Sequence, residues 1–153
     1  LYVFLMFIGA SPGSTGGGIK TTTFGVILLG VINTLRSTTD IEVERRRISW
    51  DIFNKAIAMV FISLIYISIV LLFLMETEKD IPFISLLFEL ISAFGTVGLS
   101  RDLTPLLKDF SKLLLILTMF IGRVGPLTMT MAMTERIIKK EKYRYPKDNI
   151  LIG

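Results

Sequence analysis

Residues 56–75 form an apolar stretch of twenty residues that contains no charged side chain. At about 1.5 Å per residue, a helix of this length measures about 30 Å, which is the thickness of the hydrocarbon core of a membrane. The chain as a whole has a mean hydropathy of +0.66, which is typical of membrane proteins. A buried helix in a soluble protein is the alternative interpretation of this stretch. We expect an all-α membrane protein.

Two further apolar runs follow this first one. Residues 113–133 make a second candidate span, with Arg123 as its single charge. Residues 84–94 make a third run of only 11 residues, with Glu89 inside it. A run of that length is too short to cross a membrane and is more typical of a re-entrant or core helix.

The N-terminal region contains two short apolar pieces, residues 1–10 and 24–32, on either side of residues 11–23. The intervening stretch holds one proline and four glycines, which a continuous helix does not tolerate. Neither apolar piece spans a membrane alone. Together they predict one crossing helix that is interrupted by an intramembrane loop.

The connections between these segments differ in charge. Basic residues are concentrated in residues 33–55 and after residue 133, whereas residues 76–83 carry one lysine against three acidic residues. By the positive-inside rule, the first two regions are cytoplasmic and the third is outside. The run at 84–94 must then enter and return on the same side. Lengths and charges therefore predict a helix–pore loop–helix unit, with 95–100 as the returning strand.

The returning strand reads Gly95-Thr96-Val97-Gly98-Leu99-Ser100. Non-helical backbone within a membrane must be buried in protein or line water, and rings of backbone carbonyls replace the hydration shell of potassium in channel filters. Gly98 permits the backbone angles that such a strand needs. An ordinary turn is the alternative. The predicted cation site consists of the carbonyls of Thr96, Val97, Gly98 and Leu99, with Gly95, Ser100 and Glu89 as its support.

The interrupting loop contains Gly13, Ser14, Thr15, Gly16, Gly17, Gly18 and Lys20. It resembles a nucleotide-binding P-loop, but Ile19 separates the last glycine from the lysine, and apolar segments flank it. We favour an unwound part of a transmembrane helix that lines or closes a permeation path. A purely structural kink is the alternative. Lys20 either takes part in this function or extends to the cytoplasmic mouth.

Arg123 lies at the centre of the second candidate span, between Gly122 and Gly125. A charge at that depth is costly and normally faces a partner inside the protein. The carbonyls of the glycine-rich loop would suit its five donors and make it part of a gate. An ion pair with Glu89, which would only stabilise packing, is the alternative.

The amino-acid composition excludes several kinds of functional site. The chain has no cysteine and no histidine, so it holds no disulfide, no Cys/His zinc site and no histidine-dependent triad. Its net charge of +4 comes from basic residues beside apolar segments, which suits a membrane surface better than nucleic acid. We expect no enzyme, no covalent cofactor and no side-chain metal site.

Three segments, in this order, resemble the Trk/Ktr/HKT superfamily of cation transporters. They are Gly-Ser-Thr-Gly-Gly-Gly-Ile-Lys-Thr-Thr-Thr (13–23), Gly-Thr-Val-Gly-Leu-Ser (95–100) and Gly-Arg-Val-Gly-Pro-Leu-Thr (122–128). The resemblance implies a pore subunit with four helix–pore loop–helix repeats, of which this chain is the C-terminal fragment. By the resemblance, 95–100 is the fourth filter strand, 11–20 is the gating loop, and Arg123 contacts that loop.

The resemblance also divides the chain into parts. Residues 1–37 would be the last helix of the third repeat, 38–55 a cytoplasmic loop with an interfacial lead-in, 56–133 the fourth repeat, and 134–153 a cytoplasmic basic tail. It implies potassium uptake through the cell membrane, with sodium as activator or coupling ion. It further implies a homodimer, regulated by a cytosolic nucleotide-binding ring as in the bacterial Ktr branch. A non-conducting membrane anchor or interaction subunit is the alternative function.

Overall fold

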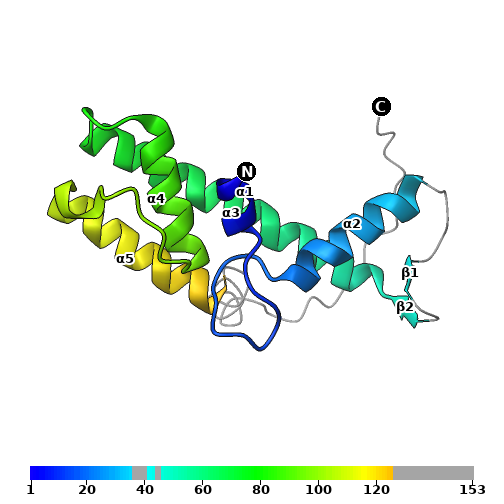
Figure 1. The fold of residues 1–153 in the computed structure, drawn as a ribbon. Helices are drawn as coiled ribbons and strands as arrows, with labels where there is room; N and C mark the ends of the chain where they lie inside the picture. The colour runs from blue at the N-terminus through cyan, green and yellow to red at the C-terminus, as the bar shows by residue number, and fades with distance from the viewer. Residues whose placement is uncertain (36–40, 44–45, 126–153) are drawn as a thin grey trace, which may run out of the picture.

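The computed structural model describes residues 1–35, 41–43 and 46–125, and these residues are mainly helical (Figure 1). The elements are α1 (Tyr2–Phe7), α2 (Thr21–Leu35), β1 (Ile41–Val43), β2 (Arg46–Ile48), α3 (Trp50–Thr77), α4 (Phe83–Gly95), the 3-10 turn η1 (Thr104–Leu106) and α5 (Asp109–Val124). The expected α-helical class is confirmed, apart from the short β1–β2 hairpin. The part of the predicted second span that lies at 126–133, and the basic tail, fall outside the described residues.

Helix α3 is the longest helix, with α2 beside its first half, the hairpin at its N-terminal end, and α4 and α5 beside its second half (Figure 1). It has 28 residues, so it is about 42 Å long. Within the described residues it is the one helix long and apolar enough to cross a membrane. It begins at Trp50 and not at residue 56, because residues 50–55 contain no glycine or proline and continue the helix.

The hairpin occupies part of the connection that we expected to be a cytoplasmic loop. Its strands are antiparallel, with Ile41 opposite Ile48 and Val43 opposite Arg46. The β-branched residues at 41, 43 and 48 favour this extended conformation locally. The hairpin links α2 to α3, which then run antiparallel.

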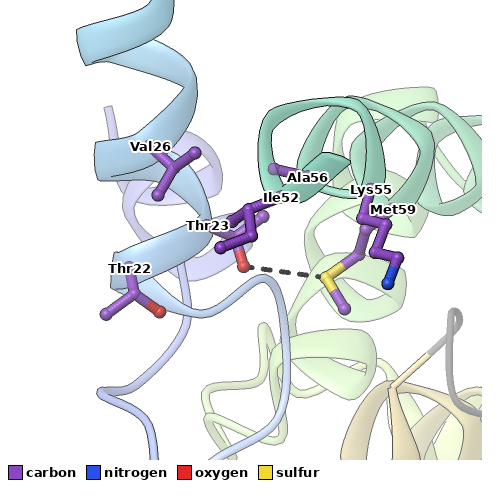
Figure 2. Close-up of a pocket in the computed structure, with 7 residues that line it drawn as sticks. All are labelled: Thr22, Thr23, Val26, Ile52, Lys55, Ala56 and Met59. Carbon is purple, nitrogen blue, oxygen red and sulfur yellow. Dashed lines mark hydrogen bonds between the residues drawn. The ribbon is translucent and has the colours of Figure 1, made fainter. Parts of the chain in front are cut away.

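Helices α2 and α3 approach each other closely at a glycine of α2. A Cβ on Gly30 of α2 would lie 2.0 Å from the ring of Phe53 in α3, so only glycine allows this approach. Two turns away, the Thr23 hydroxyl contacts the Met59 sulfur at 3.8 Å. A cavity of about 250 Å³ lies beside this contact. Figure 2 shows the residues that line it, Thr22, Thr23, Val26, Ile52, Lys55, Ala56 and Met59.

Helix α4 lies at the centre of the hydrophobic core. It has 13 residues, which is about 20 Å and too short to cross a membrane, and nine of them are buried. Leu86, Leu90 and Phe94 are at most 1% exposed, and they pack with Leu74 of α3 and Leu115 of α5. Burial of each such side chain contributes about 1.5–3 kcal/mol. This short helix is therefore held firmly by α1, α3 and α5.

The end of α3 is joined to the start of α5 by one carboxylate. Glu78 Oε1 accepts hydrogen bonds from the Lys108 amide (2.8 Å) and the Ser111 hydroxyl (2.8 Å). Burial raises the pKa of Glu78, but these hydrogen bonds and the neighbouring lysine charges lower it by more, so that its pKa lies below the usual 4.5. The ionised Glu78, directly after the end of α3, thus caps the start of α5.

Candidate functional site

Helix α4 ends at Gly95, and Thr96 then adopts the left-handed conformation, with φ 50° and ψ 38°. The Thr96 amide donates to the carbonyl of Ala93, and the Val97 amide donates to that of Ser92, so that the last turn is closed. Glycine normally occupies such a position, and a β-branched residue is an outlier there. The chain leaves α4 at a sharp, defined angle.

The segment that follows, residues 96–100, exposes its backbone. Val97, Gly98, Leu99 and Ser100 are exposed, and Gly98 has φ 80°, as expected from the sequence. Among the described residues, the carbonyls of 96–99 accept no hydrogen bond. Within the described part of the chain, four consecutive carbonyls without a partner thus lie at the C-terminal, partially negative end of α4.

Glu89 anchors the far end of this segment. It lies on α4, is 5% exposed, and its carboxylate accepts hydrogen bonds from the Ser100 hydroxyl (2.5 Å), the Arg101 amide (2.7 Å) and the Thr104 hydroxyl (3.2 Å). The Arg101 guanidinium also donates to Ser85 Oγ at 3.1 Å. The 96–100 segment is therefore fixed at both ends by α4. The role of Glu89 as support for an ion site stays a prediction.

The glycine loop, residues 8–20, connects α1 to α2. It is closed at its base by two bonds, from the Gly9 amide to the Ile19 carbonyl (2.7 Å) and from the Ile19 amide to the Phe7 carbonyl (3.2 Å). Lys20 Nζ donates to the Gly16 carbonyl at 2.7 Å. Lys20 is therefore used to hold the loop itself.

The glycine loop lies directly against the C-terminal ends of α4 and α5 (Figure 1). The Gly17 amide donates to Thr96 Oγ1 at 2.7 Å, and the Gly18 amide donates to the Gly122 carbonyl at 3.2 Å. A Cβ on Gly17 would lie 2.9 Å from Thr96 Cγ2 and 3.0 Å from the Phe94 carbonyl oxygen. The three segments singled out in the sequence thus meet at one place, whereas the loop tip at residues 13–15 is exposed.

A cavity of about 670 Å³ lies between the 96–100 segment and α5. One wall carries Glu89 and the 96–100 segment, and the other carries apolar residues of α5 together with Arg123. Among the described residues, the Arg123 side chain has no hydrogen bond or ion pair, and the loop instead contacts the neighbouring Gly122. The direct contact between Arg123 and the loop stays a prediction.

Sequence reasoning missed two features of this site. The first is the Thr96 side chain, which we had considered only for its carbonyl. The second is the role of Gly9, Gly95 and Gly122 as points of close approach, since a Cβ at each would fall within 2.6 Å of a backbone carbonyl oxygen. Gly95 and Gly122 begin two of the three motifs, which was the available signal, whereas Gly9 lies outside the motifs.

Comparison with known proteins agrees with this arrangement. The profile of the TrkH family, described as a cation transport protein, matches residues 1–143. The chain belongs to the TrkH family. The resemblance to Trk and Ktr transporters inferred from the three segments is thereby confirmed.

Several curated relatives within this family align with nearly the whole chain. Ktr system potassium uptake protein B of Bacillus subtilis (strain 168) is 42% identical over 151 residues, which is 99% of this chain and 33% of that protein. Ktr system potassium uptake protein B of Vibrio alginolyticus is 37% identical over 153 residues, which is 100% of this chain and 33% of that protein. Potassium/sodium uptake protein NtpJ of Enterococcus hirae is 38% identical over an alignment of 158 positions, which covers 100% of this chain and 35% of that protein. The chain spans about a third of the length of these relatives.

Proposed function

We propose that the full-length protein takes up potassium across the cell membrane and that this chain supplies one quarter of its pore. The observation that carries the proposal is the row of carbonyls at 96–99, which accept no hydrogen bond from any of the described residues and follow a buried helix too short to span a membrane. Family membership and the potassium uptake relatives support it. The rest of the pore would come from three further strands of the same polypeptide.

In this proposal, potassium loses part of its hydration shell to the carbonyls of Thr96, Val97, Gly98 and Leu99. The C-terminal end of α4 adds a partial negative charge at the same point. Binding is through backbone oxygens, so selectivity depends on the geometry of the strand and not on a side-chain ligand. Sodium would act as an activator or coupling ion, in line with the name of the potassium/sodium relative.

The charge pattern supports a topology for the proposed pore. The basic connection before α3 would be cytoplasmic, and the acidic connection after it would face outside. Helix α4 and the 96–100 segment would then form a re-entrant pore loop, and the chain after α5 would return to the cytoplasm. The homodimer and the cytosolic nucleotide-binding ring belong to the same proposal.

The glycine loop is proposed as the gate. Gly17 donates a hydrogen bond to Thr96 at the start of the 96–100 segment, and Gly18 donates one to Gly122 of α5. Arg123 on the cavity wall would place a positive charge in the path of a cation. Withdrawal of the loop would open the path.

Complementation tests this function. The full-length protein should restore growth of a cell deficient in potassium uptake at low potassium concentration. Gly98→Ser should abolish this growth or admit sodium, because a side chain is strained at φ 80°. Gly25→Ser is the matched control, since a Cβ there meets nothing within 4 Å and φ is ordinary. Unchanged growth with Gly98→Ser, at normal expression, would contradict the filter assignment.

A further inference from the structure

The end of helix α4 does not by itself explain the left-handed backbone conformation of Thr96. Its φ of 50° places a β-branched side chain in the left-handed region, which such residues seldom adopt. Positions of this kind persist only where the surroundings hold them, and they concentrate at binding sites and switch regions. Two sets of contacts hold Thr96: the closing bonds of α4, and the glycine loop.

The contact from the glycine loop is specific to the Thr96 side chain. The Gly17 amide, which is buried, donates to Thr96 Oγ1 at 2.7 Å across 79 positions in the sequence. Since Gly17 lacks a Cβ, it approaches both the hydroxyl and the methyl group of Thr96 closely. The bond fixes the rotamer of Thr96, and through it the orientation of the peptide that begins the 96–100 segment.

The glycine loop has few other attachments to the 96–100 segment. Its base is closed on α1, Lys20 ties it to itself, and Gly18 is bonded to α5. Among the described residues, the bond from the Gly17 amide is the single hydrogen bond between the glycine loop and residues 96–100. If the loop withdraws, a buried donor loses its acceptor and the strained Thr96 loses its partner at the same moment.

We propose that the Thr96 side chain couples the position of the glycine loop to the ion affinity of the 96–100 segment. With the loop seated, Thr96 is held left-handed, and the carbonyls of Thr96 and Val97 point as the structure shows. With the loop withdrawn, Thr96 relaxes and these carbonyls turn. Because coupling between two sites is reciprocal, an ion on the segment also changes how firmly the loop is seated. This inference rests on the proposed function.

A reporter at the exposed loop tip measures the position of the loop. Ser14→Cys is introduced into the full-length protein with any cysteines outside this chain replaced, since residues 1–153 contain none. The rate of labelling by a water-soluble maleimide is measured on purified protein in potassium chloride and in choline chloride. Thr96→Val, which keeps the shape but removes the acceptor, is compared with Thr96→Ser, which keeps the hydroxyl.

The parent should label at different rates in the two salts. Thr96→Val should label about two- to tenfold faster in potassium chloride, the range expected for the loss of one intramolecular hydrogen bond, and should no longer respond to potassium. Thr96→Ser should behave as the parent. Thr96→Ala, which also removes the hydroxyl but is less strained than valine at this φ, replaces Thr96→Val if that variant does not fold.

Thr118→Val is the matched control. It removes a buried threonine hydroxyl that bonds to Tyr66 at 3.0 Å between α3 and α5 and that, among the described residues, makes no hydrogen bond to the loop. Equal labelling rates in the parent and in Thr96→Val would overturn the proposal. Equal acceleration by Thr118→Val would also overturn it, because general loosening would then explain the result. Since labelling needs no transport, failure of potassium uptake by the parent would contradict the proposed function separately.

Discussion

The carbonyl oxygen of Phe94, at the end of α4, would lie 2.0 Å from a Cβ on Gly122 of α5. The two helices therefore cross with backbone against backbone at this point. The Gly122 carbonyl at the same place accepts the bond from the Gly18 amide. The C-terminal ends of α4 and α5 and the glycine loop are therefore in mutual contact at this crossing.

Gly122→Ala should disrupt the crossing of α4 and α5. The added methyl group must displace backbone, and overpacking of this kind costs about 1–3 kcal/mol. We expect a lower midpoint of thermal unfolding for the purified full-length protein and reduced potassium uptake. Gly25→Ala is the control, because its Cβ meets nothing within 4 Å and should stabilise α2 by up to about 1 kcal/mol. Equal midpoints for the two variants would contradict the close approach.

Glu89→Gln should weaken potassium binding while leaving the fold intact. Glutamine keeps the size of the side chain but removes the charge and one of the two acceptors that hold the Ser100 hydroxyl, the Arg101 amide and the Thr104 hydroxyl. A roughly tenfold weaker apparent affinity in uptake assays, about 1.4 kcal/mol, is expected. Glu76→Gln serves as control, since its pair with Lys79 is largely exposed and contributes little. The same affinity in both variants would count against a supporting role for Glu89.

Removal of the gate should raise the rate of cation flux. Deletion of residues 13–18, or Arg123→Ala, removes the loop or the positive charge from the proposed path. Flux into vesicles should rise about tenfold for each 1.4 kcal/mol of barrier removed. Lower flux in a protein that still folds would indicate a structural role for these residues.

Acid should destabilise the junction of α3 and α5. The pKa of Glu78 in the folded protein lies below its usual value of 4.5, so ionised Glu78 stabilises the fold fully above about pH 4.5. That contribution is lost as pH falls below 4.5 through the folded pKa. In Glu78→Gln, the unfolding midpoint should fall less between pH 6 and pH 3.5 than in the parent. An identical fall in both proteins would show that other groups cause it.

The helices and the special backbone of Gly98 follow from local patterns. The lengths of the apolar runs at 56–75 and 84–94 distinguish a candidate span from a short core helix. Helix α3 nevertheless starts six residues earlier than residue 56, because helix continuity depends on the absence of breakers and not on where the charges stop. The hairpin at 41–48 was not expected, since its alternating pattern is short and highly charged.

The contacts that join these elements could not be predicted in the same way. Thr96 and Gly17 are 79 positions apart, and neither the spacing of apolar residues nor a sequence motif predicts that they meet. Glu78 caps a helix that starts about thirty positions later, so the capping patterns that act within one helix do not reveal it.

By itself, the sequence predicted the long apolar helix, the order of the helices and the family, because hydrophobic length, charge and glycine content act locally. The ion site at 96–99 stays a prediction. The tertiary structure alone decided that the glycine loop binds the Thr96 hydroxyl and that α4 and α5 touch at Phe94 and Gly122. Such contacts depend on how distant segments pack, where a single Cβ or hydroxyl decides whether two backbones meet.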